Sequence, residues 1–600
     1  MKVLFFSPFS NVWEHSFPEG LVAESFAARG VQVAAVRCDG ILKVHCVAMS
    51  AAGVGIDSPL ATREQVCRAC VKRRDFITER MQIPAIVLDE WVTDADRDYV
   101  ESVVASLRPD TWTEFELDGV PLGRYAAYEL WLNLKLVSTD LTPAVWAHYV
   151  GQLRNTLYAY LGGAKILDAE RPDAIIVYND HYSVNHAFSA AARARGIRSY
   201  TIHGGHHIVR RAETLSILAS GHTMEDVFRS EAWNEYSRAP IGKSEIDLVA
   251  SHFDGLLEGS SAFAYSSAFE GTGSRELRHR LGIADGARVL LAAMSSEDEL
   301  MGVRLIDAIP TNLTQTSLFA DQFEWVDFLF EYARRHPDVH LLLRLHPRMF
   351  PNKRENVLSP VASQIMARRD DAPKNITFNM PSDGLALYDI MQIVDVLLNF
   401  RSTVGAELSS FGIPVVVPSN ADFYTYPSTL NRVGHTTEEY GAQIDAALRE
   451  GWSLENARRA YRWYAFLFSR FAVDFSDAVS SRPIAVRPKK PGLRLRLWNK
   501  FVFLVLQHGP LVRERLAIRN RGLSESSQEV LLDVVKGGLD AAPDSKLWPP
   551  IDVTLEEESA LLRERLLGFA EARWSAEADP DSLAGRIRSH LAADASVGGR

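Results

Sequence analysis

The chain of 600 residues is too long for a single hydrophobic core, because domains usually stop growing near about 250–300 residues. A hydrophobic fraction of 47% and a charged fraction of 24% are typical of an ordinary globular protein and exclude wholesale disorder. The formal net charge of −11 argues against a protein that coats nucleic acid, so no nucleic-acid partner is expected.

The chain opens with a short apolar run, Met1 to Pro8, which is too short for the core of a signal peptide and is interrupted by the proline. No stretch approaches the ~20 apolar residues that a membrane-spanning helix needs. We therefore expect a cytoplasmic protein whose chain begins with a β-strand.

In the first 270 residues, short β-branched or aromatic runs alternate with helical patterns, which is typical of a parallel sheet wound by helices. Strands are predicted at 3–7, 31–37, 174–178 and 198–202. Apolar spacing over 75–170 indicates a helical segment. We assign 1–258 to a first Rossmann-like domain and the Gly- and Ser-rich run 259–274 to a hinge.

A second series of alternating strands and helices begins at Arg288. Strands are predicted at 288–293, 339–345, 394–399 and 413–417, with a helix at 403–411 between the last two. These elements define a second Rossmann-like domain at 275–480. Residues 481–600 form a basic and then helical C-terminal extension beyond the two cores.

All four cysteines, Cys38, Cys46, Cys67 and Cys70, fall within one window of 33 residues. A CxxC pair with two further thiols in a reducing compartment favours a structural, tetrahedral zinc site, for which His45 is a substitute ligand. Such a site would pin the 39–66 loop. An iron–sulfur cluster and free or redox-active thiols remain open as alternatives.

Polar residues follow two strands of the second domain, where ligands of open doubly wound sheets bind. Ser402 and Thr403 open a helix and offer hydroxyls and amides to a phosphate, and Glu407 lies one turn further on. Arg344 and His346 alternate along the end of a buried strand, so both point toward the crevice, where the guanidinium suits a phosphate.

Each of these assignments has a purely structural alternative. Ser402 or Thr403 could only cap its helix, and Arg344 with His346 could only be a structural arginine with a satisfied core histidine. Two further serines follow the strand at 288–293. The hydroxyls of Ser295 and Ser296 either meet the same phosphate or belong to an ordinary capped turn.

Three stretches, Phe323–Trp325, Leu343–Arg348 and Asp395–Val415, together resemble the bacterial capsule and surface-polysaccharide glycosyltransferases. The resemblance covers most of residues 285–420. It implies a GT-B fold, in which an N-terminal acceptor domain and a C-terminal donor domain face a cleft. In that group, and in similar sialyl-, Kdo- and glycerophosphate transferases, such motifs contact the phosphate and ribose of a cytidine nucleotide. These roles would fall to His346, Ser402 and Thr403, with no divalent metal needed at the donor.

The chain departs from retaining members of this fold at Asn399, eight positions before Glu407, where a second glutamate would stand. This departure favours inverting transfer, which needs a general base in the N-terminal domain. Glu19 and Asp180 follow strand ends and are the favoured bases, and His203 is expected to contact phosphate or acceptor. Each carboxylate is equally explained as a helix cap or a first-turn charge.

The sequence thus predicts a glycosyltransferase that moves a sugar from a nucleotide sugar, CMP-linked by the resemblance, to a surface or capsular polysaccharide or a lipid-linked glycan. The alternatives are a nucleotide-sugar epimerase, a CDP-glycerol-type glycerophosphotransferase and a non-catalytic scaffold of polysaccharide assembly. The basic and aromatic segment 482–506 predicts either a peripheral contact with the inner face of the cytoplasmic membrane or a linker packed on the N-terminal domain.

Overall fold

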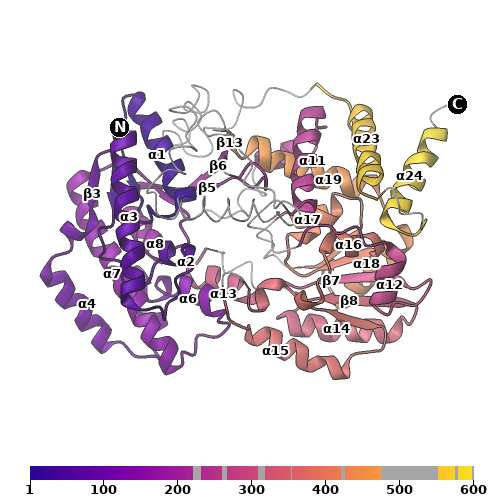
Figure 1. The fold of residues 1–600 in the computed structure, drawn as a ribbon, viewed down its shortest axis with the longest axis horizontal. Helices are drawn as coiled ribbons and strands as arrows, with labels where there is room; N and C mark the ends of the chain where they lie inside the picture. Colours follow the sequence, from indigo (N-terminus) through magenta and orange to yellow (C-terminus); the bar gives the residue numbers. More distant parts are fainter. Residues whose placement is uncertain are drawn as a thin grey trace, which may run out of the picture.

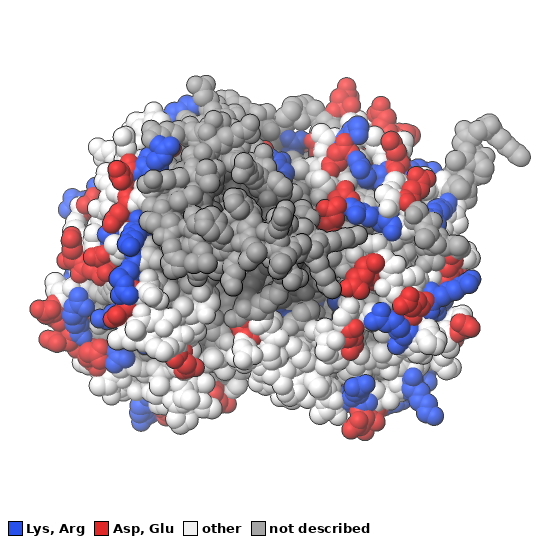
Figure 2. Space-filling model, in the orientation of Figure 1, with Lys and Arg blue, Asp and Glu red and all other residues white. Residues whose placement is uncertain are grey.

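The computed structural model describes residues 1–211, 213–219, 231–259, 267–308, 318–352, 355–419, 426–474, 552–574 and 579–597. Figure 1 shows two lobes side by side, each built on a β-sheet with helices around it. On the face drawn in Figure 2, basic and acidic side chains are interspersed over both lobes. Within the described ranges, no helix is both long and apolar enough to cross a membrane.

The N-terminal sheet has seven strands in the order β13-β6-β5-β4-β1-β2-β3. Their bounds are β1 (Lys2–Phe6), β2 (Gln32–Arg37), β3 (Ala85–Val87), β4 (Ala174–Tyr178), β5 (Arg198–Gly204), β6 (Thr214–Ala219) and β13 (Val473–Asp474). The first five are parallel to their neighbours in the order 3-2-1-4-5, and β6 runs antiparallel to both β5 and β13. The central strand β1 is buried from Val3 to Phe6 because helices cover both faces of the sheet.

The C-terminal sheet has six strands, all parallel, in the order β12-β11-β10-β7-β8-β9. Their bounds are β7 (Arg288–Ala293), β8 (Val339–Arg344), β9 (Ile376–Asn379), β10 (Val396–Asn399), β11 (Val415–Pro418) and β12 (Arg432–Gly434). Counted from the first strand of this sheet, the order is 3-2-1-4-5-6, which defines a Rossmann fold. The chain therefore has two Rossmann-like domains, as a GT-B fold requires.

The α-helices of the N-terminal lobe lie on both faces of its sheet. In the N-terminal lobe, α1 (Trp13–Ala28) and α3 (Leu60–Met81) pack on one face of the sheet, and α7 (Pro143–Glu170) with α8 (Ser183–Arg193) pack on the other. The other helices in chain order are α2 (Val47–Ala51), α4 (Asp94–Ser106), α5 (Leu122–Tyr125), α6 (Tyr128–Leu134), α10 (Glu231–Tyr236), α11 (Lys243–Leu257), α12 (Ser274–Arg280), α13 (Glu297–Leu305), α14 (Gln322–Arg335), α15 (Pro360–Ala367), α16 (Leu387–Ile390), α17 (Val404–Ser409), α18 (Thr437–Glu450), α19 (Leu454–Ala465), α23 (Leu555–Trp574) and α24 (Leu583–Val597).

All eight predicted strands are present, with ends shifted by two residues at most. The sequence did not predict β3, β6, β9, β12 and β13, which are short or lie toward the sheet edges. The helical segment predicted at 75–170 is interrupted by β3 and is otherwise mostly helical. The fold class could therefore be predicted from apolar periodicity, whereas strands that are very short or lie toward a sheet edge could not.

Elements from each lobe pack into the other lobe, so the two lobes are connected by more than one hinge segment. Helix α11, assigned by sequence to the first domain, packs into the core of the second. In the opposite direction, α13 follows β7 and buries Leu300 and Val303 in the N-terminal core, and β13 joins the N-terminal sheet. Across this junction, Arg124 forms two hydrogen bonds of 2.7 and 2.8 Å to the carboxylate of Asp307. Residues 260–266 of the predicted hinge lie outside the described residues.

The predicted C-terminal extension contributes to the second core instead of standing beyond it. Helices α23 and α24 bury a row of apolar side chains in the second core, among them Leu562, Phe569 and Ile587. Helix α23 packs against α11 and α19, and α24 packs against α23 (Figure 1). Arg586 of α24 pairs with Asp395 at 3.0 Å. The basic segment 482–506, for which a membrane contact was predicted, lies outside the described residues.

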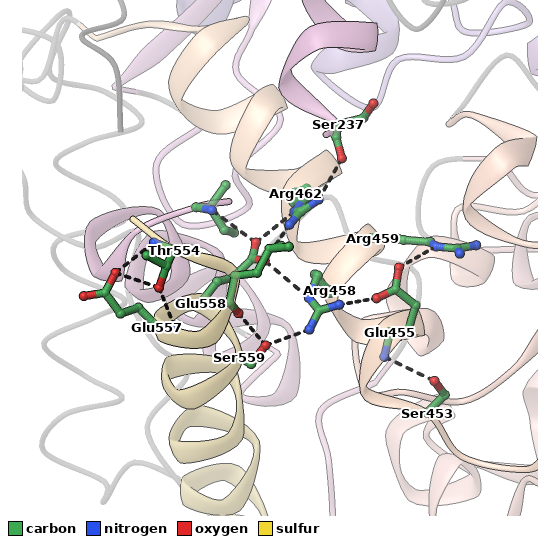
Figure 3. Close-up of polar contacts among 12 residues, drawn as sticks. Ser237, Ser453, Glu455, Arg458, Arg459, Arg462, Thr554, Glu557, Glu558 and Ser559 are labelled. Atoms are coloured by element: carbon green, nitrogen blue, oxygen red, sulfur yellow. Dashed lines mark hydrogen bonds and ion pairs between the residues drawn. The ribbon is translucent and has the colours of Figure 1, made fainter. Parts of the chain in front are cut away.

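A buried carboxylate attaches α23 to the rest of the lobe (Figure 3). Glu558 is 0% exposed and accepts two hydrogen bonds from Arg462, at 2.8 Å from Nε and 2.6 Å from Nη2. It also accepts the backbone N–H of Ile241 at 3.1 Å, and Arg458 Nε lies 3.3 Å away. A buried charge is tolerated only when it is paired and hydrogen-bonded in this way.

We predict that Glu558→Gln lowers the free energy of unfolding of the C-terminal lobe by about 3–5 kcal/mol, because the change leaves the buried Arg462 guanidinium without its counter-charge, whereas Arg458 keeps its ion pair with Glu455. Chemical denaturation followed by tryptophan fluorescence measures the loss. The matched control is Glu556→Gln, an exposed neighbour on the same helix, which should shift stability by no more than about 0.5 kcal/mol. Equal effects of the two changes would contradict a stabilising role for the buried pair.

Candidate functional site

A cavity of about 340 Å³ lies between the lobes at the carboxyl ends of β7, β8 and β10. On its C-terminal side it is lined by five of the seven residues that the sequence placed around a phosphate, namely Arg344, His346, Ser402, Thr403 and Glu407, but not by Ser295 or Ser296. The loop after β5 and the helices α11 and α19 supply the other walls. The volume lies within the range of about 300–1,000 Å³ that small-molecule sites occupy.

Arg344 brings a cation to this cavity without a matching carboxylate. Its Nη1 donates hydrogen bonds to Asn379 Oδ1 and to the carbonyl of Leu385, the second at 3.3 Å. In the part of the chain that the structure describes, no acidic side chain forms an ion pair with it. Burial lowers the pKa of Arg344 to about 10, so the group stays charged at neutral pH. A half-buried cation in this state favours an anion in the cavity.

His346 is neutral, and its tautomer is defined by its neighbours. Its Nδ1 accepts the backbone N–H of Arg348 at 3.3 Å, which leaves the ring proton on Nε2. Burial, together with the charges of Arg348 and Arg344, lowers the pKa of His346 to about 4. The ring therefore acts as a neutral hydrogen-bond donor beside the Arg344 cation.

The loop that carries Ser402 is held by Asn399, the residue at the end of β10. Its Nδ2 donates to the Ser402 carbonyl and to Tyr426 Oη, each at 2.7 Å, and its Oδ1 accepts the Ser402 N–H at 3.1 Å. A side chain at Gly405 would begin 1.7 Å from Tyr426 Oη, so only glycine fits beneath this loop. The side chain of Asn399 thus holds the loop that carries Ser402 in place.

Ser402 and Thr403 combine a structural role with a place in the cavity wall. Ser402 Oγ accepts the Val404 N–H at 3.4 Å, and Thr403 Oγ1 donates to Glu407 Oε1 at 3.1 Å. Helix α17, which follows them, has only six residues, so its dipole offers less to an anion than the sequence suggested. The hydroxyl groups carry more of the expected polarity than the helix end does.

Glu407 is a carboxylate held inside the cavity wall. Tyr388 Oη donates to its Oε2 at 2.9 Å, and burial raises the pKa of Glu407 above its usual value despite the hydrogen bonds from Tyr388 and Thr403. Such a group is suited to accept hydrogen bonds from ligand hydroxyls, for example those of a ribose.

Several residues that line the cavity were not predicted from the sequence. His206 and Arg211 come from the loop after β5, His252 comes from α11, and Trp463 with Tyr464 comes from α19. The loop after β5 also contains Gly205, and its backbone passes close to β6, because a side chain at Gly205 would begin 1.8 Å from Thr214 Oγ1. Nothing local in the sequence singles out α11 or α19.

Five predicted site residues do not line the cavity. Ser295 exchanges backbone hydrogen bonds with the Gln322 side chain, and Ser296 Oγ donates to Asp298 Oδ1 at 2.8 Å, as expected of an ordinary capped turn. Glu19 points into the first lobe, where Ser7 Oγ donates to it.

Asp180 is 5% exposed and lies near two cations or potential cations, His186 at 3.7 Å and Arg193 at 3.6 Å. Burial acts to raise its pKa, but these neighbours prevail, and the net shift is downward. His203 Nδ1 lies 2.9 Å from the Gly204 carbonyl, and burial lowers its pKa to about 3. The catalytic roles of Glu19, Asp180 and His203 stay predictions, now without a position on the cavity.

All four cysteines converge on a second, much smaller cavity of about 20 Å³ in the N-terminal lobe. Each is a free thiol, and burial raises the pKa of every one of them. Among the described residues, no group of three or more His, Cys, Asp or Glu side chains has a geometry that could hold a metal ion. The predicted zinc site, with His45 as a substitute ligand, therefore has no support from this geometry, although the four thiols do gather in space.

The sequence matches no known family profile, and no curated protein sequence matches it. Among solved structures, the chain is similar to the UDP-GlcNAc 2-epimerase of Neisseria meningitidis bound to UDP-GlcNAc, at 13% identity over 78% of this chain and 97% of that one, with a TM-score of 0.25. KpsC, a beta-Kdo 2,4 transferase of Thermosulfurimonas dismutans, has 15% identity over 52% and 84%, with a TM-score of 0.30. The spinosyn rhamnosyltransferase SpnG has 10% identity over 78% and 95%, with a TM-score of 0.22. At these values no residue role or substrate carries over, and the fold assignment rests on the strand orders.

The burial of Glu19 predicts a pH-dependent stability. Burial raises its pKa from 4.5 to about 7, against the opposing effects of Ser7 and Arg37, so the folded state favours the protonated form. The stabilisation is complete below pH 4.5 and is lost as the pH rises to about 7. Glu19→Gln should reduce the dependence of the melting temperature on pH over this interval, while the part due to Glu129, whose pKa is also raised by burial to about 7, remains. Glu14→Gln, an exposed change on the same helix, should keep the wild-type profile, and a Glu19→Gln profile that also matched wild type would refute the assignment.

Proposed function

We propose that the chain is a glycosyltransferase that binds a nucleotide sugar in the cavity between its two Rossmann-like domains and transfers the sugar to a surface or capsular polysaccharide or a lipid-linked glycan. The observation that carries the proposal is the Arg344 guanidinium, charged and without an ion-pair partner among the described residues, at the carboxyl end of β8. In Rossmann-like sheets this is where nucleotide phosphates bind. The acceptor class is proposed from the resemblance of residues 285–420 alone.

The cavity wall offers the groups that departure of a nucleotide requires. When the bond between the sugar and the phosphate oxygen breaks, negative charge develops on the phosphate. Arg344 supplies a full positive charge at that point, and His346 supplies a neutral N–H donor. The Ser402 and Thr403 hydroxyls border the same space. Such prepositioned donors stabilise the leaving group without covalent chemistry from the protein.

A base is also needed, and the cavity favours His206 for this role over the residues that the sequence suggested. His206 lines the cavity, whereas Glu19, Asp180 and His203 do not, and its imidazole is neutral because burial and the charge of Arg211 lower its pKa to about 4. This low pKa makes it a weak base, so its position supports the role and its pKa does not. It would take the proton of the acceptor hydroxyl as that oxygen bonds to the anomeric carbon and the phosphate leaves. This inverting transfer agrees with Asn399, whose side chain braces the loop.

The donor-site proposal predicts that nucleotides raise the melting temperature, and that Arg344→Met and His346→Ala each remove much of this effect. Loss of a charge-assisted contact should weaken binding by about 10- to 100-fold. A thermal-shift series with CMP, CDP, UDP and GDP measures the effect and identifies the nucleobase that the site prefers. Arg334→Met, which removes an exposed arginine on α14, serves as the control. Unchanged nucleotide binding in the Arg344→Met variant would contradict the proposed donor site.

For His206→Ala we expect sugar transfer to fall by about 10²- to 10⁴-fold with nucleotide affinity nearly unchanged, because general bases contribute on that scale. Turnover of the stabilising nucleotide sugar is measured with and without a glycan acceptor. Conversion of the donor in the absence of any acceptor would instead identify an epimerase. Wild-type transfer by the variant would return the role of base to Glu19 or Asp180.

A further inference from the structure

The loop after β8, residues 345–350, extends from the proposed donor site to the N-terminal lobe. His346 lines the cavity, and Arg348, two positions later, is only 4% exposed. Arg348 Nη2 donates a hydrogen bond of 2.8 Å to the carbonyl oxygen of Leu132, in the last turn of helix α6 of the N-terminal lobe. The same loop therefore contacts the cavity through one residue and the other lobe through another.

Two carboxylates hold the Arg348 guanidinium in this position. Asp298, in the first turn of α13, accepts a hydrogen bond from Nη2 at 2.8 Å, and Glu355 accepts one from Nη1 at 2.9 Å. Helix α13 packs against α6 (Figure 1), so Arg348 lies where α6, α13 and the loop after β8 meet. Because a buried charge that loses its partner is strongly destabilising, this arrangement resists displacement of the side chain.

A buried lysine makes a second connection between α6 and the chain that follows β8. Lys135, directly after α6, is 0% exposed, and its Nζ donates to the carbonyl oxygens of Phe350 at 2.7 Å and of Val357 at 2.6 Å. Both acceptors lie between β8 and α15 in the sequence. A shift of α6 relative to the C-terminal sheet must therefore move these two carbonyl groups or break the bonds.

His346 is linked to this junction through the backbone of Arg348. Its Nδ1 accepts the Arg348 N–H at 3.3 Å, and that bond leaves the ring proton on Nε2. When the Arg348 side chain is displaced, its backbone N–H is displaced with it, and the ring of His346 loses a partner that orients it. The orientation of a cavity residue thus depends on a side chain that the other lobe holds.

Building on the proposed function, we propose that Arg348 is a positioning residue for His346 and makes the donor site sensitive to the position of the N-terminal lobe. With α6 and α13 as they lie in the structure, Arg348 keeps the His346 Nε2–H as a hydrogen-bond donor on the cavity wall. When α6 moves away, the Arg348 backbone follows its side chain, and His346 no longer matches a bound phosphate. A nucleotide consequently stabilises the arrangement of the lobes that binds it best.

The test is a double-mutant cycle on nucleotide affinity, measured by calorimetry on the full-length chain with whichever of CMP, CDP, UDP and GDP stabilises wild type most. The cycle combines His346→Ala with Arg348→Met or Arg348→Lys. Lys135→Met provides an independent cycle without a change at Arg348, and melting temperatures without ligand establish which variants fold. The matched control is Arg124→Met, which also breaks a contact between the lobes, the pair with Asp307, but has no printed bond to the loop after β8.

Arg348→Met should weaken nucleotide binding by about tenfold, and in the His346→Ala background it should change the affinity by no more than about twofold. Lys135→Met should show the same dependence on His346. Arg348→Lys should weaken binding less than Arg348→Met, because lysine keeps the charge but not the two-armed geometry of the guanidinium. The effect of Arg124→Met on affinity should be equal with and without the His346 imidazole, as expected of sites that share no partner.

The inference is overturned if the losses caused by Arg348→Met and His346→Ala add fully, if Arg348→Met leaves nucleotide affinity unchanged, or if Arg124→Met depends on His346 to the same extent. Each of these results leaves the proposed function standing as long as a nucleotide binds and Arg344→Met weakens it. If no nucleotide binds to wild type, the proposed function and this inference fall together.

Discussion

Burial removes water from the Arg344 guanidinium, whose hydrogen bonds go to an amide oxygen and a carbonyl oxygen, while the Asp383 carboxylate acts on it without forming an ion pair. The charge is held in place because β8 pairs with both β7 and β9, and Asn379 at the end of β9 lies beside it. The surrounding groups are arranged to match it, since the lining histidines are neutral and Glu407 is itself engaged by Tyr388 and Thr403. The cavity consequently presents positive charge to whatever enters it.

The walls of that cavity come from segments that cross between the lobes. Helix α11 leaves the N-terminal sheet and enters the C-terminal core, while α13 follows β7 and packs back into the N-terminal core. With Arg124 and Asp307 paired at the same junction, closure of the cleft has to pivot about a packed contact and not about a free linker. Motions of this kind are small sliding or tilting movements of packed helices.

The central strands of both sheets and the phosphate-side residues were predictable because they depend on local patterns, whereas the short or peripheral strands β3, β6, β9, β12 and β13 were not. A buried strand followed by polar residues indicates where the sheet ends, and Arg344, His346, Ser402, Thr403 and Glu407 all follow from it. The opposite wall was not predictable, because His252 and Trp463 reach the cavity only through the packing of α11 and α19. Glu19 shows the limit of the strand-end argument. The pattern places it near the sheet edge, but helix α1 turns its side chain toward Ser7 and Arg37.

The attachment of α23 through Glu558 bears on how the chain folds as it is synthesised. The Arg458 and Arg462 guanidinium groups are made long before the Glu558 carboxylate that they share, since 96 positions separate Arg462 from Glu558. At about 5–20 residues per second, that interval lasts roughly 5–19 s. During it, the nascent second lobe holds two arginines facing an incomplete apolar surface. A chain stalled in this interval would expose that surface, which makes it a natural target for chaperones that bind unfinished domains.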